Sequence, residues 1–255
     1  MKVSLRNRIG EQYLKKADEI KLDYRDINSL PDLYEKFPDK EFLLVLWFEE
    51  IDWEKIKEMY ILSKGKLSIS LSDWRDARKV EEIGMDYMFN FCATTAYSFN
   101  SIIENFNVKY IKVSAPLFFD MNFLKPYANK IRLMPNISIT DLPQKNGAHG
   151  SWIRPEDLDL YEEYCAMIEF EGVRTSAEEA LYRIYFEQKS WPGELNMIIN
   201  NLNYPGTNRM LHRDLTEIRL NCKQVCEING SCSLCERSLL LADPAKIKKY
   251  EEEKS

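Results

Sequence analysis

Phe42-Leu43-Leu44-Val45-Leu46-Trp47-Phe48 is an unbroken run of apolar residues. Continuous rather than alternating hydrophobicity is typical of a parallel strand that is buried on both faces of its sheet. Asp52 follows and can cap a helix over 53–63, which places Ile56, Met59 and Tyr60 on one helical face. This stretch therefore predicts a strand followed by an amphipathic helix, the repeating unit of an α/β fold.

The same alternation continues on both sides of this unit. Further strands are predicted at 19–24, 66–71, 87–91, 108–113, 131–134 and 165–170, with helices over 74–83, 96–106, 116–130 and 177–189 between or after them. An eighth strand is expected at Gly150-Ser151-Trp152-Ile153-Arg154, before Pro155 opens another helix. Eight strands in βα alternation favour a closed (β/α)8 TIM-like barrel over residues 1–190, and an open doubly wound sheet is the alternative.

The composition limits the class of protein. A chain of 255 residues with 45% hydrophobic residues can bury one sizeable core. No run of about 18 apolar residues is present, and Met1-Lys2-Val3-Ser4-Leu5-Arg6 becomes charged too soon for a secretory signal, so we expect a cytoplasmic protein without membrane contact. The net charge of −6 argues against general nucleic-acid binding, which depends on neutralising phosphates with Lys and Arg.

Four of the six cysteines lie close together in the pattern Cys222-x3-Cys226-x5-Cys232-x2-Cys235. Four thiolates at this spacing can converge on one tetrahedral zinc ion or hold an iron–sulfur cluster, and Asn229-Gly230 supplies a tight turn between the two pairs. The alternative is free thiols or two disulfides, and a cytoplasmic location disfavours the disulfides. The sequence therefore predicts a metal site, Zn or [4Fe-4S], in a C-terminal extension over 191–245 that precedes a charged tail at 246–255.

Charged residues near the ends of the last predicted strands are candidates for catalysis. Barrel enzymes place their chemistry at the carboxyl ends of the strands, where this chain has Arg154, Glu169 and Glu171. Paired carboxylates beside an arginine can do acid–base work, because the arginine lowers the pKa of one carboxyl while burial raises that of another. Glu169 lies inside an apolar strand, so it should face the barrel lumen or a partner, since an unpaired buried carboxylate is costly.

Three segments between about 67 and 187 resemble the collagenase-like peptidase family, peptidase family U-thirty-two. Tyr87-Met88-Phe89-Asn90-Phe91 leads directly into a threonine-rich helix start. Ser151-Trp152-Ile153-Arg154-Pro155-Glu156-Asp157-Leu158 is similar to a strand that runs into a helix-opening Asp-Leu. Ile168-Glu169-Phe170-Glu171-Gly172 leads into a tyrosine-containing helix, as the family's Ile-Glu-Gly segment does.

The resemblance implies a (β/α) barrel and a choice of activities. The family includes proteins called peptidases and others that hydroxylate quinone precursors or RNA bases with a cysteine-held [4Fe–4S] cluster. This chain differs in two ways: Ile168-Glu169-Phe170-Glu171 stands where the family has Lys-Ile-Glu-Gly-Arg, and its four clustered cysteines follow the last strand. The second difference favours a structural zinc over a redox cluster.

Two functions are consistent with these features. The first is an iron–sulfur-dependent or other metal-bearing enzyme that modifies a small molecule or an RNA base, with Arg154, Glu169 and Glu171 converging on a pocket. The second is a non-catalytic barrel scaffold that binds a protein partner and whose C-terminal segment is stabilised by a structural zinc ion. Barrels host many chemistries, so the fold alone does not choose between them.

The cysteine pattern predicts that protein purified without oxygen contains metal. We expect either one zinc and no colour, or iron with a broad visible absorption band, as measured by elemental analysis and spectroscopy. Substitution Cys222→Ala should lower the metal content because it removes one of four ligands. Protein that contains neither metal would contradict this prediction.

Overall fold

The computed structural model describes residues 1–47, 50–93, 95–113, 117, 121–135, 153, 155–170 and 175–189, with backbone only at 156, 157 and 175–177. The chain divides into two compact units. The first comprises Met1–Val113, Tyr127–Leu133 and Tyr164–Glu169, and the second takes the remainder.

The first unit is a closed barrel of eight parallel strands. Each strand pairs with its neighbour in the sequence, and β8 pairs with β1 to close the ring. The strands are β1 (Lys2–Arg6), β2 (Glu19–Asp23), β3 (Glu41–Leu46), β4 (Leu67–Leu71), β5 (Tyr87–Ala93), β6 (Tyr110–Val113), β7 (Ile131–Leu133) and β8 (Met167–Glu169). This is the predicted (β/α)8 architecture, and the open sheet is excluded.

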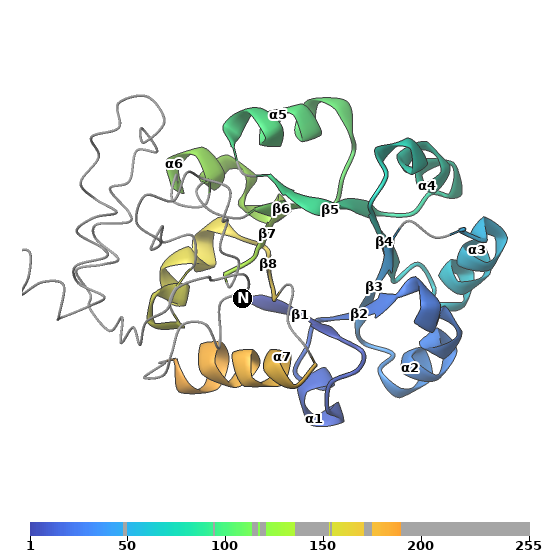
Figure 1. Cartoon of the computed structure of the whole chain (residues 1–255), viewed down its shortest axis with the longest axis horizontal. Helices are drawn as coiled ribbons and strands as arrows, with labels where there is room; N and C mark the ends of the chain where they lie inside the picture. Colours follow the sequence, from blue (N-terminus) through green and yellow to red (C-terminus); the bar gives the residue numbers. More distant parts are fainter. Residues whose placement is uncertain are drawn as a thin grey trace, which may run out of the picture. The chain divides into compact units, whose positions relative to one another are not determined.

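Helices follow the strands and lie outside the ring (Figure 1). The α-helices of this unit are α1 (Glu11–Leu14), α2 (Leu30–Lys36), α3 (Trp53–Leu62), α4 (Ala77–Ile83) and α5 (Ala96–Asn105). Short 3-10 segments add η1 (Tyr24–Ser29) and η2 (Trp74–Asp76), and η4 (Lys125–Lys130) precedes β7. No helix within the described ranges is long and apolar enough to cross a membrane.

Local sequence signals determine where these helices begin and end. The Asp52 side chain accepts a hydrogen bond from the Lys55 amide at 3.1 Å and caps α3. Thr95 and Ser98 form a reciprocal capping box at the start of α5. Gly84 ends α4 with φ of 79°, a left-handed conformation that glycine adopts without strain. These three predicted boundaries are confirmed.

One strand was assigned to the wrong segment. We expected a barrel strand at Gly150–Arg154, of which the structure describes Ile153 alone, but β7 pairs directly with β8 and the ring has no place for another strand between them. The eighth strand is instead β1, which pairs with both β2 and β8. Its sequence alternates, with Ser4 on one face and Val3 and Leu5 on the other, because the barrel interior next to it is polar.

The second unit contains α6 (Met121–Leu124), most of the 3-10 segment η5 (Pro155–Tyr164), α7 (Thr175–Tyr182) and the π-helical η6 (Arg183–Gln188). The Ile153 amide donates to the Pro135 carbonyl at 2.8 Å, and the Tyr185 hydroxyl donates to the Ile153 carbonyl at 2.6 Å. The Phe170 and Tyr185 rings lie 5.3 Å apart. These contacts order the described part of this unit around Ile153 and Phe170.

Replacing Leu5 by alanine tests the role of β1. Leu5 is fully buried, so Leu5→Ala should lower the free energy of unfolding by about 2–5 kcal/mol through lost burial and a residual cavity. Leu62→Ala, the same change at a side chain that is 39% exposed, should have a much smaller effect. Chemical denaturation measures both, and equal losses would show that β1 is not part of the folded core.

Candidate functional site

Charged side chains from four strands occupy the interior of the barrel. Side chains alternate between the two faces of a strand, so in a closed barrel every second residue points into the lumen. The buried charged residues at these positions are Glu19 and Lys21 of β2, Lys112 of β6, Arg132 of β7 and Glu169 of β8. None of them is more than 4% exposed. Bulky apolar side chains normally fill a barrel lumen, so this cluster is unusual.

The carboxylate of Glu169 is the centre of the cluster. Its Oε1 atom accepts a hydrogen bond from Lys21 Nζ and a second one, at 3.1 Å, from Lys112 Nζ. Its Oε2 atom lies 3.0 Å from Nε of Arg132. Lys112 Nζ also donates to Oδ1 of Asn90 at 2.9 Å. One carboxylate thereby joins β8 to strands β2, β6 and β7 across the lumen.

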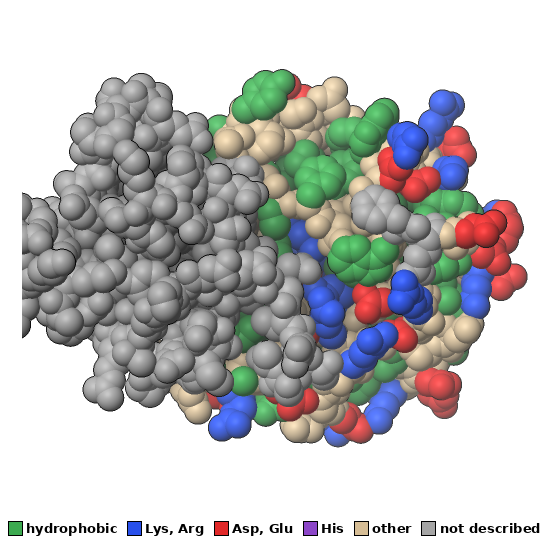
Figure 2. All heavy atoms as spheres, viewed as in Figure 1, with side chains coloured by type: hydrophobic (Ala, Val, Ile, Leu, Met, Phe, Trp, Pro, Cys, Tyr) green, Lys and Arg blue, Asp and Glu red, His purple; other side chains and the backbone are tan. Residues whose placement is uncertain are grey.

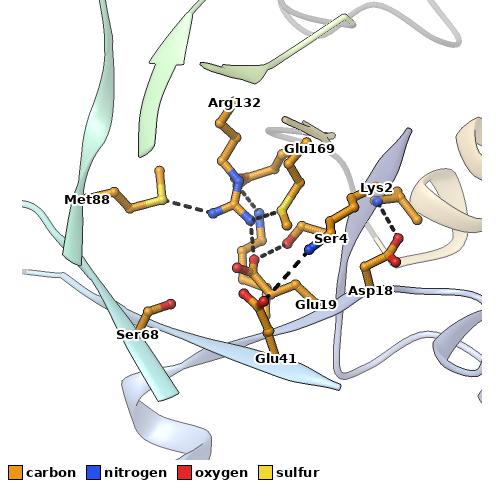
Figure 3. A network of polar contacts seen from close by, with 12 residues as sticks. Lys2, Ser4, Asp18, Glu19, Glu41, Ser68, Met88, Arg132 and Glu169 are labelled. Atoms are coloured by element: carbon orange, nitrogen blue, oxygen red, sulfur yellow. Dashed lines mark hydrogen bonds and ion pairs between the residues drawn. The ribbon is translucent and has the colours of Figure 1, made fainter. Parts of the chain in front are cut away.

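Arg132 forms the second junction of the cluster (Figure 3). Its guanidinium group pairs with Oε1 of Glu19 and donates to the sulfur atoms of Met88 and Met167. The same Glu19 oxygen accepts a hydrogen bond from the Ser4 hydroxyl at 2.6 Å. Arg132 is fully buried and lies between the two carboxylates as an ion-pair partner of both.

Apolar residues and surface ion pairs occupy the amino-terminal side of this cluster. Leu43, Met88, Tyr110 and Met167 form a buried group, and the Arg132 guanidinium lies 5.5 Å from the centre of the Tyr110 ring. At the amino-terminal ends of the strands, Lys109 pairs with Glu41 at 3.0 Å. Lys112 and Glu169 each follow a residue of this apolar group by two positions, on the carboxyl side of the barrel where barrel enzymes carry out their chemistry.

The positions of the charged residues within their strands agree with this direction. Glu169 is the last residue of β8, and Lys112 is the next to last residue of β6. Lys and Arg side-chain atoms are visible near the middle of the ring of strands in Figure 2. Glu169 and Lys112 thus lie toward the carboxyl ends of their strands, whereas Glu19 is the first residue of β2 and Arg132 is the middle residue of β7.

Electrostatics keeps the Glu169 carboxyl ionised. Burial alone would raise its pKa, but Lys112, Lys21 and Arg132 hold the pKa of Glu169 well below its usual range. Burial acts to lower the pKa of Arg132, but Glu19 and Glu169 outweigh it and raise that pKa further. Burial also raises the pKa of Tyr110, which keeps the phenol neutral. The cluster is therefore an ionic network rather than a set of neutral groups.

The carboxyl-end rim next to β2 and β3 carries a second polar chain. Arg8 donates to Asp26 at 2.8 Å and lies 3.8 Å from Asp23. Asp23 accepts a hydrogen bond from the Trp47 indole at 3.2 Å. These contacts fix an aromatic ring, 40% exposed, at the end of β3, next to the entrance of the lumen.

The structure describes only one of the predicted site residues. Glu169 points into the lumen, and its catalytic role stays a prediction. Arg154 and Glu171 lie outside the described residues, as do all four predicted metal ligands, Cys222, Cys226, Cys232 and Cys235. Within the described ranges, no group of three His, Cys, Asp or Glu side chains is arranged to hold a metal ion.

Sequence reasoning missed four members of the cluster, Glu19, Lys21, Lys112 and Arg132. The signal was present for three of them, because Lys21, Lys112 and Arg132 are charged residues between apolar neighbours in predicted strands. The argument that placed Glu169 in the lumen applies equally to these residues. Their mutual pairing was not predictable, because it depends on the register of strands that are distant in the sequence.

Comparisons with known proteins find likeness of structure only. The sequence matches no protein-family model and shows no significant similarity to a curated protein. Phosphoribosyl anthranilate isomerase from Thermotoga maritima has 11% identity and a TM-score of 0.46, over 69% of this chain and 91% of the isomerase.

Two further structures are similar to the same extent. A structure described as native KDPGal has 12% identity and a TM-score of 0.41, over 73% of this chain and 94% of its own. The 3-keto-L-gulonate-6-phosphate decarboxylase of Vibrio cholerae O1 biovar El Tor has 11% identity and a TM-score of 0.41, over 75% and 98% of the two chains. Likeness at this level says nothing about the activity of this chain.

Glu169 should control the acid stability of the barrel. Its pKa is lower in the folded than in the unfolded chain, so the stabilisation it provides is present above pH 4.5 and is lost as the pH falls through the folded-state pKa. Glu169→Gln should cost about 3 kcal/mol at neutral pH, because three cations then face a neutral amide. The stability of this variant should also fall less steeply on acidification than that of the native chain.

Denaturant unfolding between pH 7 and pH 3 measures both effects. Glu11→Gln is the matched control, since the Glu11 carboxylate pairs with Lys36 and Lys15 on the surface, and its loss should change stability little. Identical acid profiles for the native chain and Glu169→Gln would contradict the prediction.

Proposed function

We propose that this chain is an enzyme that carries out acid–base chemistry on a small molecule at the carboxyl end of the barrel. Glu169 is the central group, and Lys112 and Lys21 are the amines that share its carboxylate. A single observation carries the proposal: one buried carboxylate, at the end of its strand, holds cations from three other strands inside the lumen.

The energetic cost of the cluster supports a functional reading. Each ion that leaves water carries an effective penalty of several kcal/mol, and well-packed apolar side chains of similar volume are often as stable or more stable. A barrel that only needed a core would fill its lumen with branched apolar residues. Strongly perturbed titratable groups gathered in one place are typical of active sites. Cations near the entrance favour substrates with anionic or polarised oxygen atoms.

The finer features of the proposal come from the sequence. Glu171 comes two residues after Glu169 in the sequence, and Arg154 and Glu171 would supply further acid–base groups. Cys222, Cys226, Cys232 and Cys235 suit a zinc ion or a [4Fe-4S] cluster, and the resemblance to the collagenase-like peptidase family adds an RNA base to the possible substrates. An iron–sulfur cluster held by these four cysteines would supply electrons, and a zinc ion in the same place would stabilise the C-terminal segment.

A binding scaffold is the second candidate. Exposed aromatic side chains lie within β5 and after β3, β4 and β5, a feature that suits a protein partner. They are Trp47 at 40%, Trp74 at 62%, Phe91 at 46% and Tyr97 at 85%. A scaffold accounts for these rings but gives no reason to bury five ionisable side chains inside the barrel.

A thermal-shift experiment separates the two candidates. The probes are pyruvate, glyoxylate, 2-oxoglutarate, ribose 5-phosphate, inorganic phosphate, adenosine and uridine. We expect at least one to raise the melting temperature of the native chain, because ligand binding stabilises the folded state. The same probe should not stabilise Lys112→Met, which lacks one of the three cationic side chains of the lumen.

Lys109→Met is the matched control. It is the same substitution at the opposite end of the lumen, where Lys109 pairs with Glu41 and Asp86. It should respond to the probe as the native chain does. Stabilisation that persists in Lys112→Met would place the binding site elsewhere, and a chain that responds to none of the probes would favour the scaffold.

A further inference from the structure

We propose that Lys112 is a Schiff-base nucleophile, so that the substrates of this site are small aldehydes or ketones. This inference rests on the proposed function and names its substrate class. It follows from the geometry of Lys112, Glu169, Arg132 and Lys21 within the lumen.

The first observation is the relation of amine to carboxylate. Lys112 Nζ lies 3.1 Å from Glu169 Oε1, within reach for direct proton transfer. The other oxygen of that carboxylate lies 3.0 Å from Arg132 Nε, which fixes its orientation. A nucleophile next to a base that a third group orients is the arrangement shared by enzymes with covalent intermediates.

The second observation is the surroundings of the amine. Lys112 is 1% exposed, and Lys21 donates to the same Glu169 oxygen, so two amines approach one atom inside the barrel. Lysine amines react as nucleophiles once they have lost a proton; burial and a neighbouring cation favour that loss, and Glu169 is the group placed to accept the proton. A surface lysine has neither condition.

Position selects Lys112 rather than Lys21. Lys112 is the next to last residue of β6, and Lys21 is the third of five residues in β2. Lys112 is also held by Oδ1 of Asn90 at 2.9 Å, which aligns its amine. Lys21 then acts as the adjacent cation.

The reaction needs no group beyond these side chains. Glu169 accepts a proton from the Lys112 ammonium, and the amine lone pair forms a bond to the carbonyl carbon while the π electrons move to oxygen. Glu169 returns the proton to that oxygen and gives a carbinolamine. It then carries a second proton from nitrogen to the hydroxyl, which leaves as water. Ammonium and carbonyl have become a protonated imine and water, and Glu169 is again a carboxylate.

Reductive trapping tests this step. The full chain is incubated with glyoxylate or pyruvate and sodium cyanoborohydride, and the products are analysed by intact mass and peptide mapping. We expect one reduced adduct per chain, on the peptide that contains Lys112. Lys112→Arg, which keeps the cation but cannot form an imine, should lose it, and Lys109→Arg should keep it.

A kinetic comparison tests the role assigned to Glu169. Trapping in Glu169→Gln should be about 100-fold slower, since proton transfer by a positioned side chain contributes on that order. Unchanged trapping kinetics in this variant would remove Glu169 from the reaction, and melting temperatures verify that each variant is folded.

Mapping of the native chain needs no variant, so the proposal can fail even where a substitution prevents folding. An adduct on Lys21, on surface lysines alone, or on no lysine would overturn it. Thermal stabilisation by a probe without a Lys112 adduct would overturn the imine and leave the proposed active site in place. The absence of both would overturn the two proposals together.

Discussion

The Glu169 carboxylate is the interaction on which the rest of the barrel interior depends. It is fully buried in the lumen, where it accepts hydrogen bonds from Lys21 and Lys112 and pairs with Arg132, which come from three other strands. Removing Glu169 leaves Lys21 and Lys112 buried without this counter-ion, which costs far more than the ion pairs contribute when the network is complete. The cluster can therefore form only when all four strands are in register, and barrel closure and ion pairing depend on each other.

A polar lumen also explains features of the sequence that an apolar one would not produce. Strands β1 and β2 alternate polar and apolar residues, because one face packs outward and the other meets the charged interior. Strand β3 is apolar on both faces from Phe42 to Leu46, since Leu43 belongs to the apolar layer with Met88 and Tyr110. The alternating strands thus border the charged part of the lumen, and the continuously apolar strand β3 borders its apolar layer.

The difference between alternating and continuously apolar strands determined which strands could be predicted from the sequence. Strands that are apolar on both faces, such as β3, were located within one or two residues, and so were the helices capped by Asp52 and Thr95. Alternating strands match the pattern of a buried parallel strand less well: β2 was predicted over 19–24, but β1 was missed. Glu169 was placed in the lumen from burial cost alone. Its partners required the ring order of strands, which local patterns do not encode.

The cost of burying several cations around Glu169 also helps to distinguish a catalyst from a scaffold. A network that served only to hold the barrel together would gain nothing from two lysines on one carboxylate oxygen, because the second ammonium adds desolvation and repels the first. A single lysine would satisfy the acceptor. Paired amines become useful when one of them must change its protonation state during a reaction, and Glu169 lies within proton-transfer distance of both. The redundancy of cations around Glu169 is thus better explained by chemistry than by stability.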